Sequence, residues 1–333
     1  MNTLVDSFNR IHRDLRVSLT DRCSLRCTYC MPQDFDKWLP NDELLTTNEL
    51  LTVIEIATQH GINQVRLTGG EPLLRPDIVD IVARIKALPI SPELSLTTNG
   101  LKLAKLAQPL VDAGLTRVNV SLDTLNPMRF KEMTFRDRFD DVIAGLEAAK
   151  VAGLAPIKIN AVLMEGVNDG EAVELLTWAL AEGFDLRFIE QMPLDAGGIW
   201  DRSKMVSSEK IFAALSKIYV LSPVPARGSA PAEEFYVNGG PKKVGIIASV
   251  SKPFCGACDR LRLTSDGQLR SCLFSKEEMD LRKVLRNTEM TAGEINAEIS
   301  ARLLKTVQGK LAGHGINDLA FVQPDRPMSA IGG

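Results

Sequence analysis

The segment DRCSLRCTYC, residues 21–30, places cysteines at positions 23, 27 and 30. Three thiolates so close together commonly bind a metal, and a tetrahedral metal site takes four ligands. Their spacing is too tight for a regular helix or strand, so we expect them on the loop that leaves the first strand. No fourth cysteine or histidine lies in the segment. The remaining ligand must therefore come from elsewhere.

Two kinds of metal centre are compatible with Cys23, Cys27 and Cys30. A [4Fe–4S] cluster held by three thiolates keeps one iron that the protein does not hold, and that iron can bind another ligand. Zinc is the alternative, but its fourth ligand would have to come from a distant part of a chain with only three histidines. The segment favours the cluster and leaves zinc open.

A second triplet, Cys255, Cys258 and Cys272, stands in CGACDRLRLTSDGQLRSC with C-x2-C-x13-C spacing. In isolation, C-x2-C with one distant cysteine suggests zinc. Here too the segment supplies only three ligands. The six cysteines thus form two triplets, which a framework of paired disulfides explains poorly.

The composition narrows the class of protein. The 333 residues include 39 Lys and Arg against 42 Asp and Glu, for a net charge of −3. This balance gives no support to binding of nucleic acid or of a membrane surface. No apolar run approaches the roughly 18 residues of a membrane-spanning helix, and the start lacks the layout of a secretory signal. We therefore expect a cytoplasmic protein.

Strand and helix signals alternate from Leu15 to about Glu190. Strands are expected at 15–20, 64–68, 93–98, 117–122, 157–163 and 186–190. One helix should begin with a capping box of Thr46 and Glu49, and a later one with Asn168 and Glu171. Six such repeats predict a parallel sheet, either open or closed as a complete or partial barrel. After residue 192 the chain becomes rich in Gly, Pro and Ala, so we expect domains at 1–192 and 193–333.

The pattern within the strands favours the barrel. Arg16, Arg66, Lys158 and Arg187 each stand between two apolar residues, so alternation turns them away from the helices. An open sheet covered on both faces would carry apolar runs instead, whereas a wet barrel lumen accepts these cations. Single members could equally be edge-strand residues reaching solvent. Their recurrence in four strands predicts an anion site.

The segment CSLRCTYC resembles the cysteine motif of the radical S-adenosylmethionine (SAM) enzymes, with Tyr29 as its aromatic residue. LTGGEP, residues 67–72, is similar to the family's motif for the SAM amino group. Its glycines, Gly69 and Gly70, suit a backbone that approaches a ligand closely. The resemblance implies a partial (β/α)6 TIM-type barrel and a [4Fe–4S] cluster whose open iron binds SAM. Reductive cleavage of SAM would yield a 5′-deoxyadenosyl radical.

With the second triplet included, the chain resembles the GTP 3′,8-cyclase family of molybdenum cofactor biosynthesis (MoaA family) from Arg16 to the terminal Gly332 and Gly333. The resemblance implies two [4Fe–4S] clusters. The second would be carried by a C-terminal region that closes the barrel, and this cluster would bind guanine. The cluster ligands it implies are Cys23, Cys27 and Cys30, and then Cys255, Cys258 and Cys272. The SAM contacts it implies are Tyr29, Gly70, Ser121 and Met192. The GTP contacts it implies are Arg16, Arg66, Thr97, Lys158, Arg260 and Arg262.

The same resemblance implies the reaction. The deoxyadenosyl radical would remove the 3′ hydrogen of GTP, and C3′ would bond to C8, giving (8S)-3′,8-cyclo-7,8-dihydro-GTP. The Gly332–Gly333 tail would reach the active site. The implied partners are an electron donor protein, a downstream cyclic pyranopterin monophosphate synthase and a second copy of the chain in a homodimer. The rivals are a peptide-modifying radical SAM enzyme, which generally has more C-terminal cysteines, and a zinc-stabilised binding protein.

Overall fold

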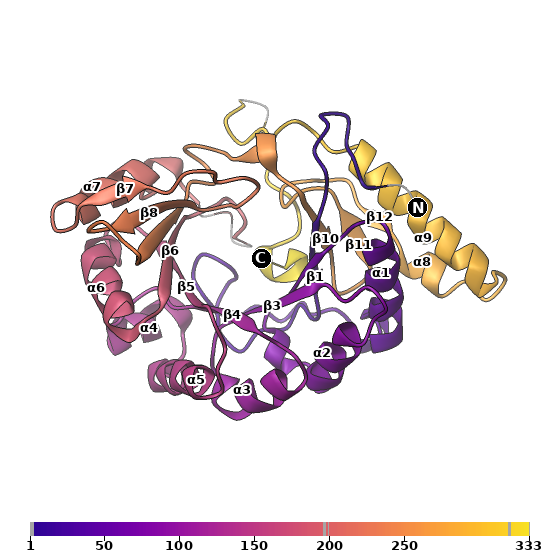
Figure 1. Cartoon of the computed structure of the whole chain (residues 1–333), viewed down its shortest axis with the longest axis horizontal. Helices are drawn as coiled ribbons and strands as arrows, with labels where there is room; N and C mark the ends of the chain where they lie inside the picture. Colours follow the sequence, from indigo (N-terminus) through magenta and orange to yellow (C-terminus); the bar gives the residue numbers. More distant parts are fainter. Residues whose placement is uncertain (1–2, 196–197, 199, 319–320, 333) are drawn as a thin grey trace.

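The computed structural model describes residues 3–195, 198, 200–318 and 321–332. Within this part of the chain, twelve strands form one sheet in the order β12-β11-β10-β1-β2-β3-β4-β5-β6-β9-β8-β7. The strands from β1 to β6 pair in parallel. Figure 1 shows the sheet curving around the middle of the molecule, with helices on its outside. The fold is the partial α/β barrel that the sequence predicts.

The central strands are β1 (Asp14–Ser18), β2 (Gln64–Thr68), β3 (Glu93–Thr98), β4 (Arg117–Ser121), β5 (Ile157–Leu163) and β6 (Asp185–Glu190). The later strands are β7 (Leu221–Pro223), β8 (Glu233–Val237), β9 (Lys243–Ile247), β10 (Arg260–Leu263), β11 (Gln268–Arg270) and β12 (Met279–Asp280). The helices are α1 (Thr47–Gln59), α2 (Ile78–Lys86), α3 (Leu103–Asp112), α4 (Pro127–Thr134), α5 (Phe139–Val151), α6 (Ala172–Glu182), α7 (Ser208–Ser216), α8 (Arg282–Leu285), α9 (Ala292–Gln308) and α10 (Met328–Ile331). The 3-10 turns are η1 (Asn41–Glu43), η2 (Pro72–Leu74), η3 (Asp169–Glu171), η4 (Arg202–Lys204) and η5 (Cys255–Ala257).

Two helix starts test the expected capping boxes. At α1 the box is confirmed, because the Thr46 hydroxyl accepts from the Glu49 N–H and the Glu49 carboxylate accepts from the Thr46 N–H. At α6 the prediction is wrong, because Asn168 precedes the 3-10 turn η3, Glu171 ends it, and neither side chain caps the helix. The Glu171 carboxylate instead accepts hydrogen bonds from Thr124. Glu171 therefore binds a buried residue distant in the sequence and does not cap its own helix.

The strand register gathers the lumen cations. Arg16 on β1 lies beside Arg66 on β2 and beside Arg262 on β10. Leu15 and Val17, which flank Arg16, have no solvent exposure and belong to the main apolar core. Alternation therefore sends the apolar residues toward the core and the arginines toward the inside of the curve.

The C-terminal region extends the sheet at both of its edges. Strand β10 pairs in parallel with β1, and β9 pairs in parallel with β6. The sheet thus runs across the boundary expected between residues 192 and 193. Its outermost strands are β12 and β7, and the last helix, α10, lies inside the curve (Figure 1).

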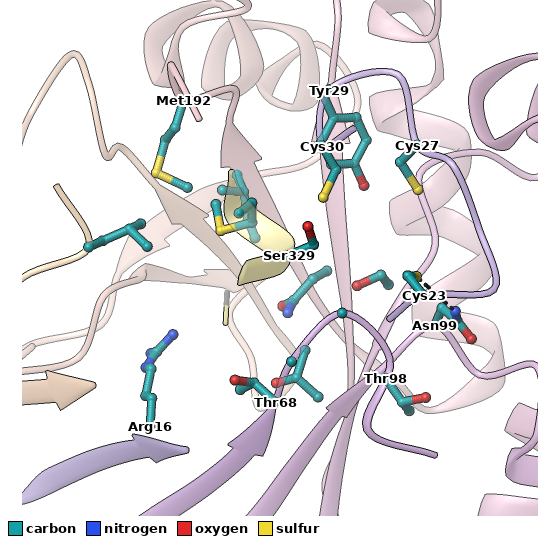
Figure 2. Close-up of a pocket in the computed structure, with 18 of the residues that line it drawn as sticks. Arg16, Cys23, Cys27, Tyr29, Cys30, Thr68, Thr98, Asn99, Met192 and Ser329 are labelled. Atoms are coloured by element: carbon teal, nitrogen blue, oxygen red, sulfur yellow. Dashed lines mark hydrogen bonds between the residues drawn. The ribbon is translucent and has the colours of Figure 1, made fainter. Parts of the chain in front are cut away.

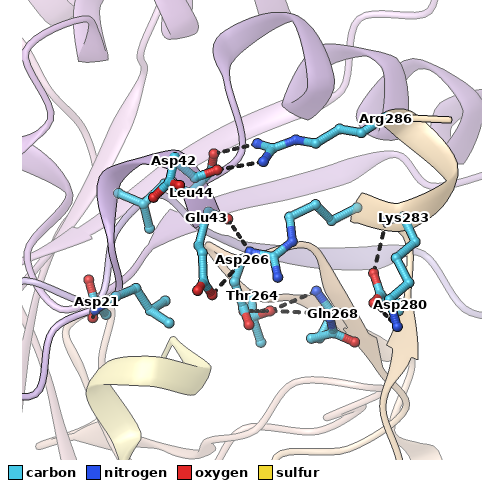
Figure 3. Close-up of polar contacts among 12 residues, drawn as sticks. Asp21, Asp42, Glu43, Leu44, Thr264, Asp266, Gln268, Asp280, Lys283 and Arg286 are labelled. Atoms are coloured by element: carbon cyan, nitrogen blue, oxygen red, sulfur yellow. Dashed lines mark hydrogen bonds and ion pairs between the residues drawn. The ribbon is translucent and has the colours of Figure 1, made fainter. Parts of the chain in front are cut away.

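Arginines from α8 and the residue after it connect the C-terminal region to η1 and to the start of α1 (Figure 3). Arg282 donates to the Glu43 carbonyl oxygen at 2.8 Å. Arg286 donates to the Leu44 carbonyl oxygen at 2.9 Å and to the Glu49 carboxylate at 2.6 Å. These contacts connect segments more than 200 residues apart. Among the helices of the described residues, none has both the length and the apolar character needed to cross a membrane.

Candidate active site

The first cysteine triplet lies on the loop after β1, as expected. Cys23, Cys27 and Cys30 line one cavity inside the curve of the sheet (Figure 2). The loop turns tightly at its end, where the Cys30 N–H donates to the Cys27 carbonyl oxygen at 2.9 Å. The end of α4 supports the loop from outside, because the Thr28 N–H donates to the Met133 carbonyl oxygen at 2.9 Å. The local fold thus directs three thiols at one space.

The three thiols share one buried space, which affects their protonation. Burial raises the pKa of the Cys23 thiol to about 11 and that of Cys30 to about 12. A positively charged group in the cavity is needed to keep these sulfurs as thiolates.

The glycines of LTGGEP line the same cavity, but their close contact is with protein backbone. A Cβ on Gly70 would lie 2.3 Å from the Asp21 carbonyl oxygen, and one on Gly69 would lie 2.5 Å from the Thr20 carbonyl oxygen. The Gly70 N–H donates to Thr20 at 2.7 Å. From the sequence, we expected these glycines to let the backbone approach a ligand. That explanation is therefore incomplete. These glycines let the β2 loop pack directly against the start of the cysteine loop.

Glu71 connects this loop to the end of β3. Its buried carboxylate accepts from the Leu73 N–H at 2.9 Å, the Thr98 hydroxyl at 2.7 Å and the Asn99 N–H at 2.7 Å. The Asn99 amide nitrogen in turn lies 3.8 Å from the Cys23 sulfur. Asn99 belongs to the segment TTNG, residues 97–100, and its contact with Cys23 depends on tertiary packing.

Tyr29 has a partner that the sequence reading did not include. Its hydroxyl donates to the Asp123 carboxylate at 2.8 Å, and the other carboxylate oxygen accepts from the Val162 N–H at 2.8 Å. Burial raises the pKa of Asp123 to about 6. Both residues line the cavity together with Ser121 and Met192, which come from the ends of β4 and β6. The expected SAM contacts are thus brought together around the cysteines.

The cavity continues to a group of arginines from the strands, and Figure 2 shows Arg16 across the space from the cysteines. The arginines that line it are Arg16, Arg66, Arg187, Arg260 and Arg262. Among the described residues, Arg16 alone of these forms an ion pair, with the Asp14 carboxylate at 3.9 Å. Burial and the charge of Arg16 lower the pKa of Arg262 to about 9, and the same two causes lower the pKa of Arg66. A bound polyanion would relieve this crowding of buried cations.

Lys158 does not line this cavity. It faces the same side of the sheet, but its ammonium lies 3.5 Å from the Asp185 carboxylate, near the amino ends of β5 and β6. Thr97 does line the cavity, and its hydroxyl accepts from the Asn119 amide at 3.2 Å. The structure therefore gathers every expected GTP contact except Lys158.

Several buried polar atoms that line the cavity have no hydrogen-bond partner within the described residues. They are Arg16 Nε, Thr68 Oγ1, Asn160 Oδ1, Arg260 Nε and Ser329 Oγ. Buried polar groups without partners are costly, and they are normally satisfied by protein, water or ligand. The cavity is thus built to hold a polar molecule.

The end of the chain enters this cavity. Met328 and Ser329 line it, and Arg262 donates a hydrogen bond to the Gly332 carbonyl oxygen. A Cβ on Gly332 would lie 2.6 Å from the Thr68 hydroxyl. The tail is therefore packed, and residue 332 must be a glycine to fit. Gly333 lies outside the described residues.

The second triplet borders a separate cavity. Cys255, Cys258 and Cys272 line it together with Lys310 and His314. The positive charges of Arg260 and Lys310 outweigh burial and lower the pKa of the Cys258 thiol to about 7. Arg260, the first residue of β10, lines the first cavity and follows Cys258 by two positions. The two cysteine sites are therefore neighbours at the start of β10.

Comparisons with known proteins agree with this geometry. Residues 17–179 match the family model of the Radical SAM superfamily, and residues 184–315 match Molybdenum Cofactor Synthesis C. A GTP 3′,8-cyclase of Streptomyces coelicolor is 55% identical over 335 residues, covering 100% of this chain and 97% of the relative. A GTP 3′,8-cyclase of Mycolicibacterium smegmatis is 54% identical over 338 residues, covering 99% of this chain and 92% of the relative.

Solved structures show the same fold at low identity. Streptococcus suis SuiB bound to S-adenosylmethionine has a TM-score of 0.59 at 15% identity, covering 96% of this chain and 77% of that one. Native anSMEcpe with bound AdoMet has a TM-score of 0.57 at 16% identity, covering 86% and 82%. With the full-length relatives above, these results show that the chain belongs to the radical SAM superfamily, in the family of the GTP 3′,8-cyclases.

Proposed function

We propose that this protein converts GTP to (8S)-3′,8-cyclo-7,8-dihydro-GTP, the first step of molybdenum cofactor biosynthesis. One observation carries the proposal: a single cavity is lined both by three cysteine thiols and by arginines that lack carboxylate partners among the described residues, Arg16 excepted. The thiols suit an iron–sulfur cluster, and the arginines suit a triphosphate. The names of the full-length relatives support the same reaction.

The superfamily implies one [4Fe–4S] cluster and SAM, and the first cavity has the residues to hold both. Cys23, Cys27 and Cys30 would ligate the cluster, and Asn99 would contact the Cys23 sulfur. When bound, the cluster and SAM supply the 5′-deoxyadenosyl radical that abstracts the 3′ hydrogen of GTP. Gly70, Ser121 and Met192 would border SAM, and Tyr29, fixed by its hydrogen bond to Asp123, would complete that wall.

The strand arginines would bind and orient the nucleotide. Arg16, Arg66 and Arg262 lie side by side in the sheet register, so their guanidinium groups can share one triphosphate. Thr97 and Arg260 would contact the rest of GTP, and Lys158 is the member of the expected set that lies outside the cavity. Holding the sugar near the cysteine end while the phosphates are fixed supplies the orientation that the bond between C3′ and C8 requires.

We further propose that Cys255, Cys258 and Cys272 hold a second [4Fe–4S] cluster, which binds guanine. Arg260 supports this arrangement, because it lines the first cavity and its charge also acts on the Cys258 thiol of the second site. Gly332 and Gly333 would act in catalysis by covering the nucleotide, since Gly332 contacts Arg262. On this view residues 1–192 supply the radical and residues 193–333 hold the base.

The remaining partners belong to the same proposal. An electron donor protein must deliver the reducing electron, and a cyclic pyranopterin monophosphate synthase should take the product onward. We also propose a homodimer and a cytoplasmic location, which suits six cysteines that form no disulfide among themselves.

Anaerobic reconstitution tests the reaction. The protein is loaded with iron and sulfide, supplied with SAM, dithionite and GTP, and assayed for 5′-deoxyadenosine and a cyclised nucleotide by mass spectrometry. We expect both products with GTP and no cyclised nucleotide with ATP. A requirement for a peptide or for ATP in place of GTP would overturn the substrate assignment.

A further inference from the structure

The N-terminal segment reaches the second cysteine site, although 245 positions separate Arg10 from Cys255. One guanidinium nitrogen of Arg10 donates to the Cys255 carbonyl oxygen at 2.7 Å and to the Ala312 carbonyl oxygen at 3.1 Å. The other donates to the Leu311 carbonyl oxygen at 2.7 Å. Arg10 therefore connects the cysteine turn η5 to the segment that follows α9.

Arg10 is itself held in place by a buried carboxylate. Its Nε donates to Asp6 at 2.6 Å, and the Arg10 N–H also donates to Asp6, at 3.0 Å. The same carboxylate lies 3.1 Å from Nε2 of His12, which is fully buried. The Asp6 side chain is buried as well. This network is well formed, and neither the radical chemistry nor GTP binding uses it.

The residue just before the connected segment is Lys310. Its ammonium donates to the Arg260 carbonyl oxygen at 2.6 Å and lies 3.5 Å from the Cys258 sulfur. Only 4% of the residue is exposed, and among the described residues it has no ion pair with a carboxylate. A buried ammonium without a carboxylate is costly unless another negative group compensates it. The nearest such group is the Cys258 thiolate.

We propose that Lys310 is a positioning residue of the second cluster, held against Cys258 by the Asp6–Arg10 strap, and that its charge raises the reduction potential of that cluster. The proposal rests on the second [4Fe–4S] cluster of the proposed function. Reduction adds a negative charge to a cluster, so a buried cation near a ligating sulfur stabilises the reduced state. Hydrogen bonds to sulfur and net charge are the protein's main means of setting such potentials.

The strap explains why the lysine can stay in place. A flexible lysine would turn toward solvent if the segment after α9 were free to move. Arg10 fixes that segment at Leu311 and Ala312, immediately beyond Lys310. Loss of Arg10 should therefore lower the reduction potential of the second cluster, as loss of the Lys310 charge should, but by a smaller amount.

Potentiometry on the second cluster alone tests the proposal. Cys23→Ala, Cys27→Ala and Cys30→Ala are combined to remove the first cluster, and the reduced signal is followed by electron paramagnetic resonance against potential. We expect Lys310→Met to disfavour reduction about tenfold, a fall of ~59 mV for a one-electron couple. Lys310→Arg should restore most of the shift, and Arg10→Gln should give part of it. Lys305→Met, which removes an exposed lysine from α9, is the matched control.

A second measurement keeps both clusters and all cysteines. We expect a chelator such as bathophenanthroline to remove the irons of the second cluster several-fold faster from Lys310→Met than from the unaltered protein or from Lys305→Met. A second cluster with unchanged potential and unchanged iron release in Lys310→Met would overturn this inference alone. A folded triple-cysteine variant that binds no iron and sulfide would overturn the second cluster itself, and this inference with it.

Discussion

The guanidinium of Arg262 donates a hydrogen bond to the main-chain carbonyl oxygen of Gly332. This contact brings the end of the chain to the arginines of the first cavity. It is supported by Ile331, which is 1% exposed and packs in a small apolar cluster with Phe274 and Leu194. The tail is thus part of the cavity wall, although its amino-acid composition resembles that of a frayed end.

Gly332→Ala should lower the rate of GTP cyclisation by roughly 10²-fold, because small displacements at a reacting site have effects of that size. The added Cβ would lie 2.6 Å from the Thr68 hydroxyl and 2.9 Å from the Ser18 Cβ. The backbone at residue 332 also has φ +86°, which an alanine adopts poorly. Steady-state assays of the cyclised nucleotide give the comparison.

Gly166→Ala is the matched control for this change. Gly166 has φ +73°, and a Cβ there would meet nothing within 4 Å. It therefore carries the backbone strain without the collision. Equal losses of activity in the two variants would show that crowding at Gly332 is unimportant.

Arg66→Met should weaken GTP binding and stabilise the empty protein. A charge-assisted hydrogen bond to phosphate is worth about 1.5–3 kcal/mol, so KM for GTP should rise roughly ten- to a hundredfold. Without GTP, the change removes a buried cation whose pKa is lowered by burial and by Arg16. The melting temperature of the GTP-free protein should therefore rise.

Arg117→Met provides the contrast for Arg66. Arg117 is paired with Glu93 at 2.6 Å, and it does not line the cavity. A partly exposed ion pair contributes about 0–1 kcal/mol, so this variant should lose a little stability and keep its KM for GTP. A lower melting temperature in Arg66→Met would contradict the idea that the empty lumen is strained by its charges.

The sequence predicted the strands well because alternation is a local property. Three of the six expected strands, 64–68, 93–98 and 157–163, have the bounds of β2, β3 and β5. Pairing of β10 with β1 and of β9 with β6 left no such signal, since it joins segments far apart in the chain. The resemblance identified a C-terminal region, but not how it adds to both edges of the sheet.

Contacts of single residues with distant parts of the chain were likewise not predicted from the sequence. Alternation placed Lys158 with the lumen cations, but its distance along the strand leaves it beside Asp185 and outside the cavity. Glu171 looked like a local cap and has a distant partner, Thr124. In each case the residue type and face were predicted, and the partner depended on tertiary packing.

Removal of one cysteine from either triplet should halve the iron content of the protein. Two [4Fe–4S] clusters hold about eight irons, so Cys30→Ala and Cys272→Ala should each retain about four with matching sulfide. Cys30→Ala should lose SAM cleavage. Cys272→Ala should still cleave SAM and form no cyclised nucleotide. Zinc in place of iron at either site would contradict the assignment for that triplet.

Tyr29→Phe should destabilise the metal-free protein, and the loss should grow with pH. The phenol donates to Asp123, whose pKa burial raises to about 6 from an ordinary 3.8. An acid with a raised pKa favours folding while it is protonated, so its contribution falls as pH rises from about 3.8 through 6. Without the phenol the pKa of Asp123 rises further, and the window in which stability falls extends above pH 6.

The expected cost of Tyr29→Phe above pH 7 is about 1–3 kcal/mol, because a buried carboxylate loses one of its donors. At pH 5 the carboxyl is mostly protonated, and the cost should be smaller. Thermal unfolding at both pH values measures the difference. Tyr219→Phe is the control, since its hydroxyl meets Thr177 at 2.7 Å in an exposed position, and it should show little change at either pH. A deficit in Tyr29→Phe that is equal at pH 5 and pH 8 would mean that the phenol acts by packing alone.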